Sequence, residues 1–244
     1  MSRLKRKTAV VTGGGTGIGL GAAKRFVDEG AFVYIFGRRQ EALDAALTQL
    51  GPSARAVQGS VANLGDLDRL YQVVKAERGG LDILFANAGT GALAPLGEIT
   101  PEQYDETFDV NVKGLLFTVQ KALPLMSAGS SIILTGSSAG AMGTAQLSVY
   151  SATKAAIRNL ARSWALDLRG TGIRINVLSP GPIKTELSLA AVGEDALEAF
   201  GATAPLGRTG DTAETAAVAA FLASSDSSFM TGGEVFVDGG LAQV

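Results

Sequence analysis

The sequence TAVVTGGGTGIG, at residues 8–19, joins a short apolar run to a turn rich in glycine. The apolar run predicts a buried strand, and the residues after the turn predict a helix. A glycine turn between a strand and a helix lets backbone N–H groups approach a pyrophosphate, whose charge then meets the positive end of the helix dipole. A plain tight turn is the alternative in a chain with 32 glycines. The residues expected to bind a dinucleotide are Gly13, Gly15, Thr16, Gly17 and Ile18.

Short apolar runs alternate with longer amphipathic ones along the rest of the chain, which is typical of βα units on a parallel sheet. Strands are expected at Thr8 to Thr12, Phe32 to Phe36, Ala54 to Gln58, Leu81 to Ala86, Ser131 to Thr135, Arg174 to Ser179 and Glu234 to Val237. Helices are expected at Ile18 to Glu29, Glu41 to Leu50, Leu64 to Arg78, Pro101 to Leu125, Val149 to Leu168 and Thr212 to Ala223.

This order predicts an α/β fold. We expect residues 1–244 to form a single Rossmann-type domain with a doubly wound, seven-stranded parallel sheet and helices on both faces. Residues 183–208 interrupt the alternation with a long connection and weak helical patterning around Glu194 to Phe200. Because ligands bind beyond the carboxyl ends of strands in such sheets, this segment is expected to be a substrate lid.

Composition narrows the chemistry. The formal charge is -2 and the longest basic run is Lys5-Arg6-Lys7, so no nucleic-acid partner is expected. The absence of histidine and cysteine excludes zinc held by those residues, and also Ser-His-Asp and Cys-His nucleophilic catalysis. No apolar run reaches the ~18 residues of a membrane span. We therefore expect a soluble, cytoplasmic protein with no membrane partner and no metal ligands, whose proton chemistry uses Tyr, Lys, Ser or carboxylates.

The end of the second strand predicts which dinucleotide binds. An acidic residue there would accept hydrogen bonds from the ribose 2′-hydroxyl and favour NAD. This chain has Gly37-Arg38-Arg39 instead. Two guanidinium groups just before a helix are unfavourable against its dipole, so an anion between them would explain their placement. A 2′-phosphate is such an anion and predicts NADP(H), whereas the plainer alternative is a solvated arginine pair.

Tyr150 and Lys154 lie four residues apart in a predicted helix and share one face. A phenol ionises near pH ~10, too high for acid–base work at neutrality. An ammonium group ~4 Å away would stabilise the phenolate by up to about 4 kcal/mol at an effective dielectric of ~20, or about three pKa units before desolvation. Ser137 and Ser138 follow the fifth strand, and either hydroxyl could orient a substrate oxygen. Together with the glycine turn, this pair indicates hydride transfer rather than a surface pair.

These motifs resemble the short-chain dehydrogenase/reductase family over nearly the whole chain. Residues 12–19 are similar to its Thr-Gly-x-x-x-Gly-x-Gly turn, and its tetrad corresponds to Asn111, Ser137, Tyr150 and Lys154, because the family's serine lies thirteen positions before its tyrosine. The resemblance implies that Tyr150 is the general acid in reduction and the base in oxidation, and that Ser137 orients the carbonyl. It also implies that Lys154 lowers the phenol pKa and holds the nicotinamide ribose, while Asn111 supports a water relay.

The same resemblance implies the remaining cofactor contacts. The alternative roles are purely structural, because Asn87 could simply stabilise a turn and Asn111 could simply satisfy the backbone of a kinked helix. Two positions depart from the family pattern, since Ser60-Val61 stands where Asp-Val is usual near adenine and Ala86 replaces a common asparagine. More narrowly, the chain resembles bacterial NADP-dependent secondary alcohol dehydrogenases and ketoreductases. The contacts implied beyond the glycine turn are Gly37, Arg38, Arg39, Ser60, Val61, Asn87, Ala88, Gly89, Tyr150, Lys154, Pro180, Gly181, Ile183 and Thr185.

The expected reaction interconverts a ketone and a secondary alcohol. No charged residue lies between Lys121 and Lys154, and the expected pocket wall at residues 139–143 is small and apolar, which favours an uncharged substrate. One alternative is a 3-oxoacyl-acyl-carrier-protein reductase, although its acidic partner needs a basic surface and residues 185–230 hold one basic residue, Arg208. Another is a non-catalytic NADP-binding sensor, which a complete tetrad disfavours. Family resemblance also implies a homo-oligomer, with a tetramer favoured over a dimer.

Overall fold

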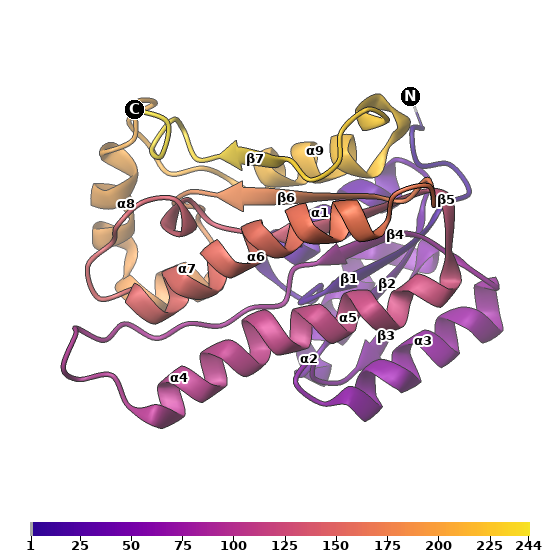
Figure 1. The fold of residues 1–244 in the computed structure, drawn as a ribbon, viewed down its shortest axis with the longest axis horizontal. Coiled ribbons are helices and arrows are strands. Elements are labelled where there is room, and N and C mark those ends of the chain that lie inside the picture. The colour runs from indigo at the N-terminus through magenta and orange to yellow at the C-terminus, as the bar shows by residue number, and fades with distance from the viewer. Residues whose placement is uncertain (1) are drawn as a thin grey trace.

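The computed structural model describes residues 2–244, which form one parallel sheet with helices on both of its faces (Figure 1). The strand order is β3-β2-β1-β4-β5-β6-β7. The order reverses direction between β1 and β4, and ligands of open α/β sheets bind at such a switch point. The strands are β1 (Thr8–Thr12), β2 (Phe32–Gly37), β3 (Ala54–Gln58), β4 (Leu81–Ala86), β5 (Met126–Thr135), β6 (Arg174–Pro180) and β7 (Glu234–Val237).

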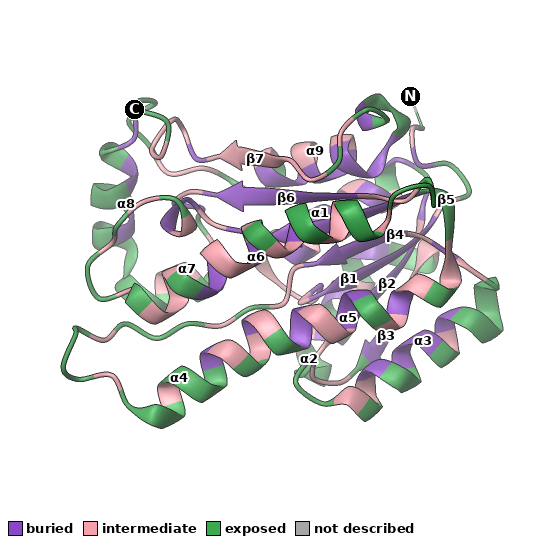
Figure 2. Ribbon diagram, in the orientation of Figure 1, coloured by how far each residue is buried: buried purple, intermediate pink, exposed green. Residues whose placement is uncertain are grey.

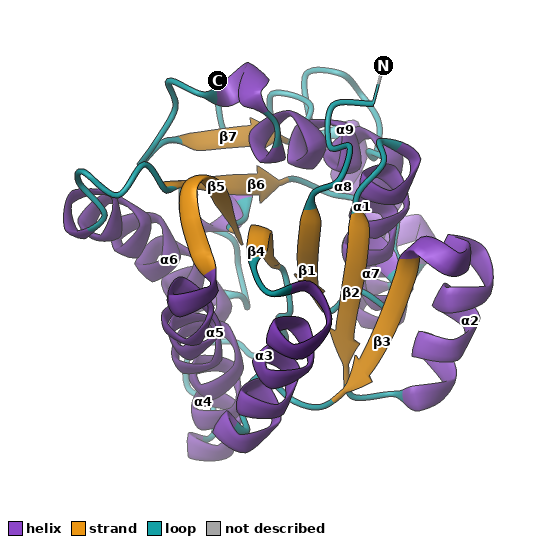
Figure 3. Cartoon of the chain, turned by 90° about the vertical axis from the view of Figure 1, so that its right-hand side faces the viewer, coloured by secondary structure: helices purple, strands orange, loops and turns teal. Residues whose placement is uncertain are grey.

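The helices divide between the two faces of the sheet, with α3, α4, α5 and α6 on one side and α1 and α2 on the other (Figure 3). Helix α9 packs against α1, so it belongs to the second side. The helices are α1 (Gly17–Asp28), α2 (Gln40–Leu50), α3 (Leu64–Arg78), α4 (Pro101–Phe108), α5 (Leu115–Ala122), α6 (Ser148–Asp167), α7 (Glu186–Val192), α8 (Glu194–Ala202) and α9 (Thr212–Ala223).

Alternation along each strand builds a core on both faces. Val10 packs into the apolar cluster beneath α3, α5 and α6, whereas its neighbour Val11 packs into the cluster beneath α1, α2 and α9. Successive side chains of a strand point to opposite faces, so a strand covered on both sides must be apolar throughout. The inner strands β1, β2, β4 and β6 are accordingly largely buried, whereas the edge strand β7 is half-buried and the outer helix faces are exposed (Figure 2).

The predicted fold class and all the predicted strands are confirmed, but one predicted helix is interrupted. Residues 101–125 follow a helical path in which α4 is followed by a π-helical turn at Asp109–Gly114, and α5 ends at Ala122. A short 3-10 turn, Leu123–Leu125, then contains Pro124, whose ring cannot continue an α-helix. The prediction of one continuous helix from Pro101 to Leu125 was therefore wrong in detail.

The connection after β6 contains more regular structure than the weak patterning predicted. Thr185 caps α7 in a capping box with Ser188, and α8 follows after Gly193. The loop between β4 and α4, residues 87–100, runs to the end of the molecule where α7 and α8 lie (Figure 1). Within residues 2–244, none of the helices combines the length and apolar character needed to cross a membrane.

Candidate active site

The glycine turn after β1 brings strand and helix backbones into close contact. Gly13 has a left-handed backbone, φ 64°, and a Cβ built on Gly19 would lie 2.2 Å from the Gly13 carbonyl oxygen. No side chain with a Cβ fits there without moving the turn. The predicted spacing of these glycines therefore has a steric cause in the structure.

Helix α1 begins with its backbone donors uncovered by side chains. Its N-cap residue, Thr16, makes no side-chain capping bond, and its first turn contains no acidic residue. Helices α3, α4, α7 and α9 are instead capped by side chains. Unpaired N–H groups at a helix N-terminus bind anions, and Gly15, Gly17 and Ile18 lie at this start. The turn thus fits the pyrophosphate of a dinucleotide.

Asn87 holds the glycine turn against β4 and β5. Its backbone N–H and that of Ala88 both donate to Thr12 Oγ1, at 3.0 Å and 3.1 Å. Its side-chain Nδ2 donates to the Thr12 carbonyl at 3.1 Å, and Thr135 Oγ1 donates to its Oδ1 at 3.3 Å. The residue therefore joins the carboxyl ends of three strands, a bridging role that sequence reasoning missed for Thr12 and Thr135.

Tyr150 and Lys154 project from the first turns of α6 toward the end of β5. The Lys154 amine donates to the Thr135 carbonyl at 2.9 Å and lies 5.4 Å from the centre of the Tyr150 ring. Ser137 follows β5, and its hydroxyl lowers the pKa of the Tyr150 phenol. Ser138 is buried and enters the next 3-10 turn, so Ser137 is the serine that faces the phenol.

The electrostatics of this pair differ from the sequence expectation. Burial raises the pKa of Tyr150 above its ordinary value, with the Ser137 hydroxyl opposing that rise. Burial also lowers the pKa of Lys154 to about 8. The expectation that the lysine lowers the phenol pKa was wrong for this structure, because the ammonium faces the ring and the Thr135 carbonyl, and removal from water disfavours both charges.

Asn111 lies in the π-helical turn and is 1% exposed. Its amide forms a reciprocal pair with Thr90, donating to the Thr90 carbonyl at 2.7 Å and accepting the Thr90 N–H at 2.8 Å. The same Nδ2 donates to Thr153 Oγ1 at 3.1 Å. A Cβ on Gly89 would lie 3.3 Å from Asn111 Oδ1 and 3.6 Å from Lys154 Nζ, so both groups flank that glycine. Asn111 thus anchors the start of the β4–α4 loop, and the water relay stays a prediction.

After β2, Arg38 and Arg39 are exposed beyond Gly37. Arg39 forms a long ion pair of 3.7 Å with Glu186, the first residue of α7. Ser60 and Val61, which follow β3 after Gly59, have different environments. The backbone N–H of Ser60 donates to an Asp66 carboxylate at 2.9 Å, whereas the Val61 side chain packs into the core.

The segment after β6 returns toward the glycine turn. Pro180 ends β6, and a Cβ on Gly181 would lie 2.6 Å from the Asp238 Cα, so this turn also requires close backbone approach. Ile183 is buried and forms an isolated bridge with Gly210. The Thr185 side chain lies 3.4 Å from the position of a Cβ on Gly17. Thr185 therefore packs against the glycine turn, beside the predicted cofactor site.

Comparisons with known proteins cover nearly the whole chain. A family profile described as Enoyl-(Acyl carrier protein) reductase matches residues 13–242. Oxidoreductase asL5 of Sarocladium schorii is 65% identical over 246 residues, covering 100% of this chain and 99% of that protein. Galactitol 2-dehydrogenase of Agrobacterium fabrum is 36% identical, covering 98% of each. The solved structure of 3-ketoacyl-(acyl-carrier-protein) reductase from Brucella melitensis complexed with NADH is 29% identical with a TM-score of 0.92, covering 98% of this chain and 99% of that one.

Proposed function

The chain belongs to the short-chain dehydrogenase/reductase family of oxidoreductases, and from that membership we propose that it interconverts an uncharged ketone and a secondary alcohol with NADP(H). The observation that carries the proposal is the cluster of the half-buried Tyr150 and Ser137 with the buried Lys154, beside an uncapped helix start. A phenol and a hydroxyl directed at one point suit proton transfer to a carbonyl oxygen.

The proposed cofactor supplies or accepts a hydride at its nicotinamide ring. In the proposal, N–H groups of the glycine turn bind the pyrophosphate, and Lys154 and Thr185 lie toward the nicotinamide half. Arg38 and Arg39 would bind the 2′-phosphate, because guanidinium groups match phosphate geometry. The NADH named for a solved relative belongs to that protein. In this chain the end of β2 carries two arginines and no carboxylate, which favours NADP(H).

Proton transfer is assigned to Tyr150. In reduction, the phenol donates its proton to the substrate oxygen while the carbonyl carbon accepts the hydride, and oxidation reverses both transfers. Ser137 donates a hydrogen bond to the same oxygen and so orients the carbonyl. Because burial brings the pKa of Lys154 to about 8, this amine exchanges protons near neutral pH and can return a proton toward the phenol side of the site.

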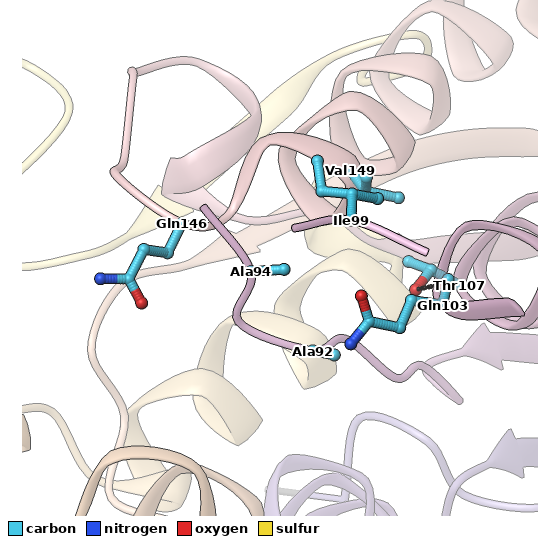
Figure 4. A pocket seen from close by; sticks show the side chains of 7 residues that line it. All are labelled: Ala92, Ala94, Ile99, Gln103, Thr107, Gln146 and Val149. Carbon is cyan, nitrogen blue, oxygen red and sulfur yellow. Dashed lines mark hydrogen bonds between the residues drawn. The ribbon is translucent and has the colours of Figure 1, made fainter. Parts of the chain in front are cut away.

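The walls near Tyr150 favour an uncharged substrate. Residues 84–97 and 122–153 contain no charged side chain, and these segments contribute the β4–α4 loop and the approach to α6. A small slot beside the start of α6 is lined by Ala92, Ala94, Ile99 and Val149, with two glutamines and a threonine at its sides (Figure 4). A charged substrate would be desolvated there without a partner, so a ketone or alcohol fits better.

The similarity to a 3-ketoacyl-(acyl-carrier-protein) reductase supports one rival, the reduction of a carrier-bound 3-oxoacyl thioester. The charges of the predicted lid, residues 183–208, oppose the docking of an acidic carrier protein. Lys184 is paired with Glu194 and Arg208 with Glu214, whereas Asp195 and Glu198 are exposed on α8. An acidic carrier protein would meet like charge there, which slows association and weakens docking.

The test is a turnover screen. Purified protein is assayed with acetophenone, cyclohexanone, 2-octanone and acetoacetyl-N-acetylcysteamine, each with NADPH and with NADH. We expect NADPH-dependent reduction of at least one ketone, and a loss of about 10²–10⁴-fold in Tyr150→Phe with unchanged NADPH binding. A strong preference for the thioester would favour the carrier-linked reaction. NADPH binding without turnover of any carbonyl would favour the sensor.

A further inference from the structure

Gly91 lies against the ring of Tyr150. A Cβ built on Gly91 would be 2.7 Å from Tyr150 Cδ2 and 3.2 Å from its Cγ. Gly91 does not have a left-handed backbone, so its φ angle alone does not require glycine. All three of the nearest atoms that such a Cβ would meet belong to Tyr150. The steric demand for glycine at this position therefore comes from the phenol ring.

The β4–α4 loop is fastened on both sides of Gly91. On one side Thr90 is held by its reciprocal pair with the buried Asn111 amide. On the other side the Ala94 N–H donates to the Gln146 carbonyl at 2.9 Å. Gln146 holds a left-handed backbone at φ 64°, a conformation that is costly for a residue with a Cβ and that concentrates at functional sites.

Gln146 precedes α6 closely, so this fastening joins the loop to the segment that leads into Tyr150. Figure 4 shows the arrangement, with Ala94 and Ala92 on the loop facing Val149, the residue before Tyr150. A loop held at Thr90 and at Ala94 has little freedom to lift. An added methyl group at position 91 would then displace the ring rather than the loop.

We propose that Gly91 is a positioning residue for Tyr150, whose bare backbone packs on the phenol ring and holds its hydroxyl toward Ser137 and the substrate oxygen. The contact is independent of the proposed reaction, and only the kinetic part of its test rests on the proposed function. Displacing the ring would move the phenol away from the Ser137 hydroxyl. Because Ser137 lowers the phenol pKa, losing its influence would raise that pKa further.

The test compares Gly91→Ala with Gly80→Ala. Gly80 is a matched control because its Cβ would meet only the Leu125 carbonyl oxygen, at 3.4 Å, and because it has no left-handed φ. Acetophenone reduction should lose between about tenfold and 100-fold in kcat in Gly91→Ala, with a smaller change in KM. NADPH binding, followed by its fluorescence, and the thermal midpoint should stay close to wild type. The alkaline-rising limb of 1-phenylethanol oxidation should shift to higher pH.

A second readout does not need turnover. The chain has 4 tyrosines, so ¹³Cζ-tyrosine labelling gives a simple NMR spectrum in which Tyr150 is identified by its loss in Tyr150→Phe. We expect the Tyr150 signal to move in Gly91→Ala and to stay in place in Gly80→Ala. An unmoved Tyr150 signal, or a rise in KM alone with an unshifted pH profile, would overturn the proposal. If wild type reduces no ketone, the proposed function fails and the NMR shift still decides this inference.

Discussion

The glycine turn (residues 13–19) and the reaction cluster (Asn111, Ser137, Tyr150 and Lys154) lie at the same edge of the sheet, but different forces shape them. The turn depends on close approach of backbones, as the 2.2 Å from a Gly19 Cβ to the Gly13 carbonyl oxygen shows. The cluster instead removes a phenol and an amine from water. This raises the pKa of Tyr150 and lowers that of Lys154, so both shifts favour the neutral form. Close packing limits which residues the turn can accept, whereas desolvation makes the cluster destabilising. A larger residue in the turn should therefore lower the free energy of unfolding, and an uncharged residue in the cluster should raise it.

The largest expected effect on stability comes from the buried amine. The pKa of Lys154 falls from 10.5 to about 8 on folding, so the unfolded state holds the proton more tightly. This penalty is complete below pH ~8 and disappears as the pH rises to ~10.5, and it amounts to at most about 3 kcal/mol. Lys154→Met should therefore raise the free energy of unfolding at pH 7 while abolishing turnover. Urea titrations at pH 7 and pH 10 measure the difference.

Lys113→Met is the control for this prediction, because Lys113 is exposed and pairs with Asp109 only four residues away. It should change stability by less than about 0.5 kcal/mol at either pH. Lower stability in Lys154→Met at pH 7, or a difference from wild type that does not shrink at pH 10, would contradict the account of the cluster.

The glycine turn should respond in the opposite sense. Alanine normally stabilises a helix relative to glycine, by about 0.5–1 kcal/mol. At Gly19 the added methyl group meets the Gly13 carbonyl, so Gly19→Ala should instead destabilise the fold by about 1–3 kcal/mol and weaken cofactor binding. Gly15→Ala is the matched control for stability, since its Cβ would make only ordinary contacts with Ala42, from 3.5 Å. Equal stabilities of the two variants in urea would remove the steric explanation.

The sequence predicted the glycine turn more completely than the reaction cluster. The turn is contiguous, and the strands around it show their burial directly in their apolar composition. The shared face of Tyr150 and Lys154 also follows from helical spacing. Spacing shows how far apart two residues lie along a helix but not how deeply they are buried. The direction of the phenol pKa was therefore mispredicted.

Other parts of the site depend on contacts between distant residues. The bond from Asn87 to Thr12 spans 75 positions, and the bond from Asn111 to Thr153 spans 42. The π-helical turn that carries Asn111 keeps the apolar pattern of a helix, so nothing in the sequence marks it. Gly91 likewise resembles any loop glycine until the Tyr150 ring is placed beside it.

The smallest expected effect concerns cofactor choice, at the end of β2. Arg39→Gln should weaken NADPH binding by roughly tenfold, or about 1.4 kcal/mol, and leave NADH binding unchanged. Because Glu186 pairs with Arg39, Glu186→Gln should free the guanidinium and tighten NADPH binding slightly. Fluorescence titration with both cofactors measures these changes. If each variant changes the affinities for NADPH and NADH equally, Arg39 does not bind the 2′-phosphate.

The central claim is that Tyr150 moves the proton in a site where Ser137 opposes the rise in the phenol pKa that burial causes. The most direct measurement is the pH dependence of kcat/KM for 1-phenylethanol oxidation in wild type and Ser137→Ala, with Tyr150→Phe as reference. The wild-type rate should rise with pH as the phenol ionises, and Ser137→Ala should move that rise to higher pH because the hydroxyl that lowers the pKa is lost. Superimposable profiles for wild type and Ser137→Ala, or the same rise persisting in Tyr150→Phe, would contradict the claim.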